Sequence, residues 1–504
     1  MTLAAELDLP TFDYTDPTLR GERFREEMAR LRSAGWLAQG PFGYVVLDRG
    51  AAEYFLRSRA AIFPGMKIAE IFGVTEGPLY EQMRRNILHV NGPDHTRLRA
   101  LLNPAMAPRA IERYRPAMQE FMAELFEEVV HGRTDGVISC EFVEAFAKPY
   151  PSRMIATVMG APLEDSERLH DWSNRIQKQF DAVSMSVERD DIERAVEEFY
   201  SYAEALVHTR RLYPADDLIS KLIEAEQVGE RLDDGECINL VFNVLVGGVD
   251  TTQSQLAHAI RLMAEHPDQW DLLRARPELA PAAVEEVLRH EPITPFTARI
   301  LTEDIEFRGV SFPEGTIVMV CAFTGNRERD DAPWQQELNP HDPPSEIEAL
   351  AARAALVANG PPATAPATVP NGAPATGDAT IPNGAPATAP TTVPNGAPAA
   401  TATASPATNG APGAGAVAPS VANGAAEPQP LSFDITADRG HMRPLTFGAG
   451  PHYCVGANLA RAEMEEALIF LAGRVRRLSL DDQPEYGSIT GIYGLSKLPL
   501  SLTL

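Results

Sequence analysis

One cysteine, Cys454, stands in the glycine-rich stretch FGAGPHYCVG near the C-terminus of the chain. The residues that follow, GANLARAEMEEALIFLAGRV, have the spacing of an amphipathic helix, so the thiol would lie just before a helix N-terminus. The helix dipole lowers the pKa of a thiol at that position and favours the thiolate. Gly448, Gly450 and Gly456 would let the backbone approach something flat and bulky. A structural cysteine on a turn is the plain alternative, but it leaves the spacing F-G-x-G-x-H-x-C-x-G unexplained.

A second unusual stretch is GGVDTT, residues 247–252, in the middle of a long run with few helix breakers. At about 1.5 Å per residue, the roughly thirty residues of this run predict one helix about 45 Å long. Each glycine costs a helix up to about 1 kcal/mol relative to alanine. Small residues would permit a close helix crossing. Alternatively, they open a groove over a bound group, with Asp250 and Thr251 beside it.

Two shorter motifs place polar residues at helical spacing. In HTRLR, His95 and Arg99 are four residues apart, so both can reach one anion from the same helix face. In EVLR, Glu286 and Arg289 are three residues apart, which in an exposed helix is an ion pair worth about a few tenths of a kcal/mol. Taken alone, each motif is more typical of solvated side chains than of a site.

Charge and cysteine usage limit the function classes. The 504 residues carry a formal net charge of −26, which argues against a nucleic-acid-binding surface. Apolar runs are interrupted well before the length of a membrane span, and the acidic N-terminus lacks the pattern of a signal peptide, so we expect no membrane anchor. The cysteines form no CxxC pair, which makes a zinc cage unlikely and favours a cytoplasmic protein with reduced thiols: Cys140, Cys237, Cys321 and Cys454.

One segment differs from the rest in composition. Residues 357–430 contain no aromatic residue, two charged residues and 15 of the 42 prolines, and the hexamer PNGAPA recurs there with a period of twelve. Such a segment lacks the apolar surface that would offset the entropy of ordering it. We therefore expect a flexible low-complexity insertion over 337–430 between two parts of one domain, 1–336 and 431–504.

The remaining residues predict a mostly helical domain with a small β-sheet region. GPDHTRLRALLNPAM has Pro93 in a first-turn position and Asp94 near the helix N-terminus, where both are favourable. PFGYVVLD, residues 41–48, reads as a strand. The alternation in IEFRGVSFPEGTIVMV predicts a small antiparallel sheet with turns at Gly309 and Gly315.

The decamer FGAGPHYCVG resembles the haem-binding loop of the cytochromes P450, the haem-thiolate monooxygenases. The resemblance extends along nearly all of the chain outside the low-complexity segment. It implies the P450-like fold, mostly α-helical with a small β-sheet region, and haem b (iron protoporphyrin IX) as cofactor. By this resemblance Cys454 is the iron ligand, Phe447 and Gly448 pack beside it, and His452 contacts a haem propionate.

Further motifs follow in the order of the family. By resemblance, His95 and Arg99 bind one propionate, and Arg299 of PFTARI holds the other. Glu286 and Arg289 would form a buried structural pair on the cysteine side of the haem.

A downstream arginine completes that pair in the family. Two residues here are candidates, Arg327 of GNRERDD and Arg439 of FDITADR, and the family register favours Arg439. The low-complexity segment stands between these two stretches, where family members usually carry a compact irregular connection. This leaves the register of Pro333–Pro344 open and would bring the insertion out on the cysteine side, where redox partners dock.

The GGVDTT stretch matches the part of the family's long helix that opens over the haem to admit dioxygen. By resemblance Gly248 borders the haem, Thr251 hydrogen-bonds the oxygen being activated, and Asp250 relays protons from solvent. Such an acid–alcohol pair argues for dioxygen activation. It counts against two alternatives, a relative that isomerises or dehydrates without external electrons and a haem-based binding or sensor protein.

The resemblance implies a bacterial-type monooxygenase that hydroxylates a hydrophobic small molecule, with electrons from a separate ferredoxin and ferredoxin reductase. Residues 61–85 match the variable region that roofs the substrate pocket, and Ile293 and Phe296 would line it from the side. Both segments are largely apolar. We therefore expect a steroid, terpenoid, fatty acid or polyketide as substrate.

Overall fold

The computed structural model describes five stretches of the chain, and the structural statements below concern these residues: 2–131, 136–227, 232–328, 432–439 and 442–504. They all belong to one compact unit. The expected insertion, 337–430, and the stretch Pro333–Pro344 lie outside the described residues.

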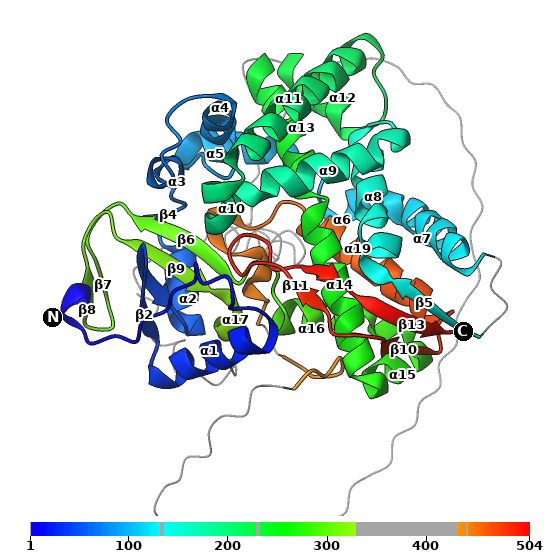
Figure 1. The fold of residues 1–504 in the computed structure, drawn as a ribbon. Coiled ribbons are helices and arrows are strands. Elements are labelled where there is room, and N and C mark those ends of the chain that lie inside the picture. The colour runs from blue at the N-terminus through cyan, green and yellow to red at the C-terminus, as the bar shows by residue number, and fades with distance from the viewer. Residues whose placement is uncertain (1, 132–135, 228–231, 329–431, 440–441) are drawn as a thin grey trace, which may run out of the picture. The chain divides into compact units, whose positions relative to one another are not determined.

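Helices make up most of this unit, which confirms the predicted mostly α-helical fold with a small β-sheet region (Figure 1). The described α-helices are α1 (Gly21–Ala34), α2 (Arg49–Arg57), α3 (Lys67–Ile71), α4 (Pro78–Arg85), α5 (Gly92–Leu102), α6 (Pro108–Ile111), α7 (Arg115–Val130), α8 (Pro149–Met159), α9 (Ser166–Gln177), α10 (Ala182–Val187), α11 (Arg189–Leu212), α12 (Leu218–Gln227), α13 (Asp234–Gly247), α14 (Asp250–Glu265), α15 (Pro267–Ala275), α16 (Ala280–His290), α17 (Ala322–Gly325) and α19 (Ala457–Ala472).

The strands form four small sheets with the orders β2-β3-β9-β6-β4, β1-β8-β7, β10-β13-β5 and β11-β12. Their bounds are β1 (Thr2–Leu3), β2 (Leu37–Gly40), β3 (Gly43–Val46), β4 (Ala61–Ile62), β5 (Val137–Glu141), β6 (Phe296–Leu301), β7 (Ile305–Phe307), β8 (Val310–Phe312), β9 (Ile317–Cys321), β10 (Arg477–Leu480), β11 (Glu485–Tyr486), β12 (Leu495–Lys497) and β13 (Pro499–Thr503).

The five-stranded sheet joins segments that are far apart in the sequence. β9 pairs antiparallel with β6 but parallel with β3, and β7 and β8 belong to a different sheet. The expected antiparallel pairing over this region is confirmed, in β6 with β9 and in β7 with β8, but the two pairs belong to different sheets, which alternation of side chains does not show. Gly309 and Gly315, at φ +74° and +79°, do form the expected turns.

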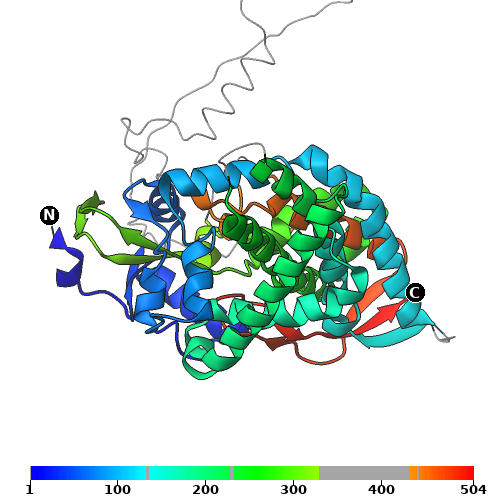
Figure 2. The same ribbon diagram turned by 90° about the horizontal axis from the view of Figure 1, so that it is seen from above.

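The sheets and helices occupy different regions of the unit. In Figure 1 the five-stranded sheet lies beside α1 and α2 near the N-terminus, whereas α7, α8, α19 and the β10-β13-β5 sheet lie near the C-terminus. Figure 2 shows the same division from above, with the two termini at opposite ends. The helix pair α13 and α14 runs between these regions and packs on both α8 and α9.

The predicted continuous helix is interrupted, since α13 ends at Gly247 and α14 begins at Asp250. Val249 lies outside the ideal helical geometry, with φ −96° and ψ −74°. The hydroxyl of Thr251 donates to the Gly247 carbonyl oxygen at 2.8 Å. A threonine that hydrogen-bonds a carbonyl one turn earlier competes with the helix ladder and bends it. The break therefore lies at the GGVDTT stretch, where the sequence combines small and hydroxyl-bearing residues.

Candidate functional site

A cavity of about 470 Å³ lies between the cysteine loop and the α13–α14 pair, and most of its lining surface is apolar. Eleven of the residues singled out from the sequence line it: His95, Arg99, Gly248, Thr251, Ile293, Phe296, Arg299, Phe447, Gly448, His452 and Cys454. These residues come from α5, the break between α13 and α14, the start of α14, β6 with the residues just before it, and the segment before α19. Motifs spread over most of the sequence thus meet at one cavity.

The cysteine loop is held by its own backbone and by α2. The amide of Cys454 donates to the Phe447 carbonyl at 2.9 Å, which closes the loop. Gly448 and Gly450 both have positive φ, at +70° and +71°, a region that other residues rarely adopt. A side chain at Gly450 would come within 2.5 Å of the Leu56 carbonyl oxygen. Two of the glycines of the decamer therefore serve the loop geometry.

The Cys454 thiol is accessible from the cavity although protein atoms surround it. This burial raises the pKa of the thiol, while the backbone N–H groups of Gly456 and Ala457 and the charge of Arg99 act in the opposite sense. The predicted net lowering of the pKa was wrong, because burial outweighs the effect of the helix N-terminus. A cation bound at the sulfur would reverse the balance, since metal coordination deprotonates a thiol.

Two arginines face the cavity without a carboxylate partner among the described residues. Arg299 is 2% exposed, and its guanidinium donates at 2.8 Å to the Ala298 carbonyl. Burial lowers the pKa of Arg299 to about 10 and also lowers that of Arg99. Buried cations are normally paired, so these two point to an anionic ligand in the cavity.

Two histidines lie beside the arginines. The rings of His95 and His452 are 4.1 Å apart between centroids, and His452 Nε2 lies 2.9 Å from Asn91 Oδ1. Burial, with the charge of Arg99, lowers the pKa of His95 to about 4. Burial and the neighbouring His95 lower that of His452 to about 3. Both rings are therefore neutral near pH 7. His95 can donate one hydrogen bond to an anion without adding charge, whereas the N–H of His452 is directed at Asn91 Oδ1.

Thr251 and Asp250 take different directions at the start of α14. Thr251 lines the cavity, whereas Asp250 does not and instead faces α9, where Asn174 Nδ2 lies 3.5 Å from its Oδ1. Asp250 is 7% exposed, and this burial raises its pKa to about 6. Asp250 is thus a buried acid behind the cavity wall, next to an alcohol on the wall.

Gly248, the second glycine of GGVDTT, fits both interpretations of that stretch, a close helix crossing and a groove beside a bound group. Gly248 lines the cavity, and a side chain there would also come within 2.6 Å of Ile155 Cδ1 on α8. A side chain at Gly247, by contrast, would meet no atom within 4 Å. Gly248 therefore permits a close helix crossing, while Gly247 leaves open space.

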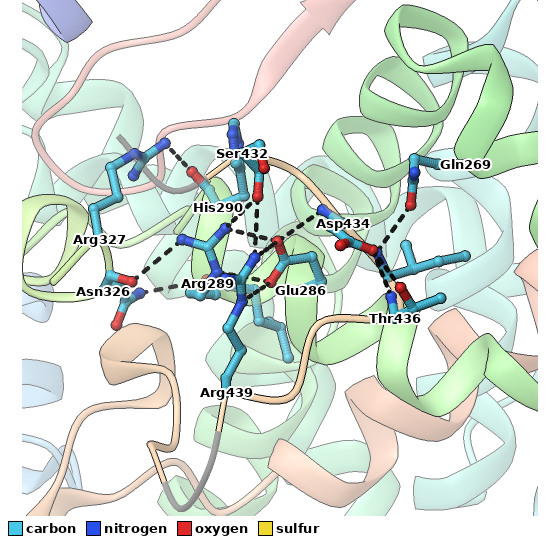
Figure 3. Close-up of polar contacts among 12 residues, drawn as sticks. Gln269, Glu286, Arg289, His290, Asn326, Arg327, Ser432, Asp434, Thr436 and Arg439 are labelled. Carbon is cyan, nitrogen blue, oxygen red and sulfur yellow. Dashed lines mark hydrogen bonds and ion pairs between the residues drawn. The ribbon is translucent and has the colours of Figure 1, made fainter. Parts of the chain in front are cut away.

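The structural pair and its third partner form a buried network behind the cysteine loop (Figure 3). Arg289 donates twice to Glu286, with both distances 2.7 Å, and Arg439 donates to the same carboxylate at 2.8 and 3.2 Å. Burial opposes ionisation of Glu286, but the hydrogen bonds from the two arginines outweigh it and lower its pKa. Arg327 instead donates to the backbone carbonyls of Phe323 and His290.

Some lining residues gave no signal in the sequence. The segment Thr490–Ile492 before β12 lines the cavity, as does Phe180, and Thr490 donates to Asp181 at 2.6 Å. This hydrogen bond joins the segment before α10 to the C-terminal strands, which are about 300 residues away in the chain. Nothing in local periodicity could have paired them. The expected roof, residues 61–85, does contribute side chains to the cavity.

The residues present fit a haem group. A flat dianionic ligand with an apolar rim would pair with Arg99 and Arg299 and lie against the apolar walls. The thiol of Cys454 reaches the same cavity and offers a soft ligand for iron. Among the described residues, no cluster of three or more histidines, cysteines and carboxylates could hold a metal ion.

Comparisons with known proteins agree with this fit. The family model described as cytochrome P450 matches residues 71–275 and 269–336. Luteothin monooxygenase from Streptomyces thioluteus is 35% identical over 326 residues, 64% of this chain and 77% of that protein. The polyketide biosynthesis cytochrome P450 PksS from Bacillus subtilis is 31% identical over 244 residues, 48% of this chain and 58% of that protein.

Solved structures show the same fold. The Bacillus subtilis PksS structure superposes with a TM-score of 0.69 at 22% identity and covers 98% of this chain and 100% of that one. Epothilone D-bound cytochrome P450epoK gives a TM-score of 0.71 at 19% identity, over 98% of this chain and 99% of that one. No helix in the described part of the chain combines the length and apolar character of a membrane span. With the cysteine loop, the unpaired arginines and the interrupted helix around one cavity, these likenesses show that the chain belongs to the cytochrome P450 family, the haem-thiolate monooxygenases.

Proposed function

We propose that the enzyme binds haem b in this cavity and uses it to hydroxylate a hydrophobic small molecule with dioxygen. Cys454 would ligate the iron as a thiolate, His95, Arg99, Arg299 and His452 would bind the propionates, and the walls would enclose the ring. The haem supplies the reduction of dioxygen and the oxidation of the substrate. The observation that supports this most is the pair of buried arginines without carboxylate partners, on the same cavity as the thiol.

The protons would come through the break between α13 and α14. Asp250 can hold a proton near neutral pH, because burial raises its pKa to about 6. Asn174 contacts its carboxylate and Lys178 lies near it, and both belong to the face of the molecule formed by α9 and the residues that follow. Thr251, next in the chain, presents its hydroxyl on the cavity wall. We propose that Asp250 exchanges protons with solvent on the α9 side and that Thr251 delivers them into the cavity.

Polyketide-derived molecules are the substrates that we favour among the four expected classes. The names of two relatives support this, a polyketide biosynthesis cytochrome P450 and mycinamicin IV hydroxylase/epoxidase of Micromonospora griseorubida. The match covers 58% of the length of the first relative and 62% of the length of the second. The electrons would come from a separate ferredoxin and ferredoxin reductase, and the enzyme would work in the cytoplasm, as in bacterial members of the family.

The ligand assignment is tested by replacing the cysteine. Cys454→Ser should abolish the strongly red-shifted Soret band of the ferrous carbon monoxide complex, because an alcohol cannot replace the electron donation of a thiolate. Cys321→Ser is the matched control, since Cys321 is buried in β9 and does not line the cavity. An unchanged band in Cys454→Ser would refute the ligand assignment. Substrate-dependent electron consumption with a ferredoxin and its reductase then separates a monooxygenase from a haem-based sensor.

A further inference from the structure

The cavity wall carries six amide side chains in the described part of the chain, and three of them hydrogen-bond the backbone. Gln179 donates to the Ile176 carbonyl and Gln255 to the Glu291 carbonyl, both at 3.0 Å. The Asn86 carbonyl oxygen accepts from the amide of Leu88 at 2.9 Å. These three amides are therefore held by the backbone.

Gln82 and Asn243 are different, because neither makes a hydrogen bond within the described part of the chain, although both line the cavity. Gln82 is 2% exposed, and both polar atoms of its amide are buried without a partner. The Nδ2 atom of Asn243 is likewise buried and unpartnered. Leaving a buried polar group without a partner destabilises the fold, and such groups are rare in native structures. Oε1 of Gln179, Oε1 of Gln255 and Nδ1 of His452 are also unpartnered on this cavity, but of these amides only Gln82 and Asn243 make no side-chain hydrogen bond among the described residues, which indicates that a ligand completes theirs.

The position of Asn243 relates this ligand to the reacting centre. Asn243, Gly247 and Thr251 are spaced by four residues along α13 and the start of α14, and all three line the cavity. At about 1.5 Å per residue, Asn243 lies about 12 Å from Thr251 along the helix. Gln82 reaches the cavity from α4, within the expected roof. The two amides therefore reach the cavity from α13 and from α4.

The charges on the cavity wall further limit the class of ligand that fits this cavity. The cations that line it, within the described stretches, are Arg99 and Arg299, and both are assigned above to the haem propionates. A substrate carboxylate would then have no cation to pair with, and a buried unpaired charge is costly. The other large lining side chains on the roof are apolar, among them Phe63, Ile68 and Phe72.

We propose that the substrate is a neutral molecule with an apolar skeleton and at least one carbonyl or hydroxyl group that hydrogen-bonds Asn243, with Gln82 binding a second such group. The group held by Asn243 is then bound about 12 Å along the helix from Thr251, at a distance from the reacting end of the cavity. This inference rests on the proposed function and refines its substrate class. It disfavours free fatty acids and pure hydrocarbons, and it favours oxygenated molecules such as polyketide lactones.

The test uses haem-loaded wild type, Asn243→Leu and Gln82→Leu. The probes are progesterone, a 14-membered hydroxy-keto macrolactone and palmitic acid, each titrated by the spectral shift of the resting haem. Wild type should bind at least one neutral probe more tightly than palmitic acid. Asn243→Leu should weaken that binding about tenfold, the loss of one hydrogen bond, and leave palmitic acid unchanged. Leu245→Met and Met83→Leu are matched controls on α13 and α4, because both residues are fully buried and do not line the cavity.

A second measurement requires no ligand. If the amides are kept for substrate, Asn243→Leu and Gln82→Leu should leave the thermal midpoint of the ligand-free holoenzyme unchanged or raise it, because leucine removes an unsatisfied polar group. A lower midpoint in both variants would show that the amides stabilise the fold and would overturn the proposal. Tightest binding of palmitic acid, or equal affinities in wild type and Asn243→Leu, would also overturn it. A wild type without the red-shifted carbon monoxide band would instead count against the proposed function.

Discussion

Asp250 and Thr251 are adjacent in the chain but meet different surroundings. The hydroxyl of Thr251 lies on the cavity wall and bonds the Gly247 carbonyl, while the carboxyl of Asp250 is enclosed between α14 and α9. Burial raises the pKa of Asp250 despite the nearby charge of Lys178, which destabilises the fold near neutral pH and yet keeps a titratable proton near the cavity. The same residue therefore lowers the stability of the fold and supplies a titratable proton, a frequent combination at functional sites.

Replacement of Thr251 should separate electron consumption from product formation. Thr251→Ala should keep haem and still consume reductant, but it should release much of the consumed oxygen as hydrogen peroxide, because the wall loses its proton-delivering hydroxyl. Thr252→Ala is the control, since Thr252 also lines the cavity. The measurement is product and peroxide formed per electron pair. Full coupling in Thr251→Ala would show that another group, most directly Thr252, handles the proton.

Replacement of Asp250 should give a pH-dependent gain in stability. The folded pKa of about 6 lies above the ordinary value of 3.8, so the protonated form stabilises the fold. That contribution is complete below about pH 4 and is lost as the pH rises through about 6. The shift of about two units corresponds to about 3 kcal/mol at most. Asp250→Asn should therefore raise the thermal midpoint at pH 8 and about half as much at pH 5.

The exposed residue Asp268 provides the control for this experiment. Asp268→Asn removes a carboxylate near the end of the same helical region without removing a buried charge. A gain in Asp250→Asn of the same size at both pH values would contradict the buried-acid interpretation. Product formation should fall in Asp250→Asn, because an amide cannot supply protons.

At the scale of elements, the buried network around Glu286 connects α16 with the strand-free segment that leads to the cysteine loop. Glu286 and Arg289 side chains are 3% and 5% exposed, and Arg439 reaches Glu286 from 150 residues further along the chain. The amide of Asp434 also donates to Glu286 at 3.0 Å. One carboxylate therefore organises two arginines and a backbone amide on the cysteine side.

Breaking this network should destabilise the enzyme strongly. Glu286→Gln removes the charge of the carboxylate that both arginines contact and should cost about 3–5 kcal/mol, the usual effect of removing one partner of a buried ion pair. Arg439→Ala leaves the Glu286–Arg289 pair in place and should cost less. Thermal unfolding and retention of haem are the measurements. Glu81→Gln, which breaks the exposed Arg84–Glu81 pair, should change neither. Equal stability of Glu286→Gln and wild type would contradict the structural role.

Sequence and structure agree where the pattern is local. The helices around His95, Glu286 and the residues after Cys454 form where their spacing predicts them, because amphipathic periodicity and first-turn residues act within a few residues. The break in α13–α14 depends on a side chain bonding back to the helix, and periodicity does not show it. The sequence also does not show that Asp250 faces α9, since that direction depends on the bend.

Long-range partners were accessible only through the family resemblance. The contact between Glu286 and Arg439 followed from family register and not from spacing. Asn243 and Gln82 were missed, because a single polar residue within an apolar helix pattern carries no signal until the cavity beside it is known. The structure was also needed for the direction in which the pKa of Cys454 shifts, because burial outweighs the effect of the helix N-terminus.

At the scale of the whole molecule, one side chain joins the two ends of the described chain that flank the insertion. Arg289 lies 3.4 Å from the carbonyl oxygen of Asn326 through one guanidinium nitrogen and 3.4 Å from that of Ser432 through the other (Figure 3). The two ends are therefore close together in space. A short connection suffices to join them, whatever lies between.

Removal of Val357–Pro430 should thus leave the domain intact. With a short Gly-Ser linker in its place, haem content should not change, and the shorter loop should be easier to close by about 1 kcal/mol. Haem spectra, melting curves and titration with the electron donor are compared between full-length and shortened proteins. Any difference should appear in the apparent affinity for the donor. Loss of haem or aggregation of the shortened protein would show that the segment is structural.

The guanidinium of Arg289 contacts the backbone carbonyls of both Asn326 and Ser432, and this shared contact has a consequence for evolution and engineering. A protein fold accepts new sequence most easily where the entry and exit points are adjacent and held by contacts that the new sequence does not supply. Arg289 meets this condition and already belongs to the network that stabilises the cysteine side. The intervening residues can therefore change in length or sequence while Asn326 and Ser432 stay adjacent. An electron-donating domain can be inserted between Asn326 and Ser432, with both of its termini attached to the chain.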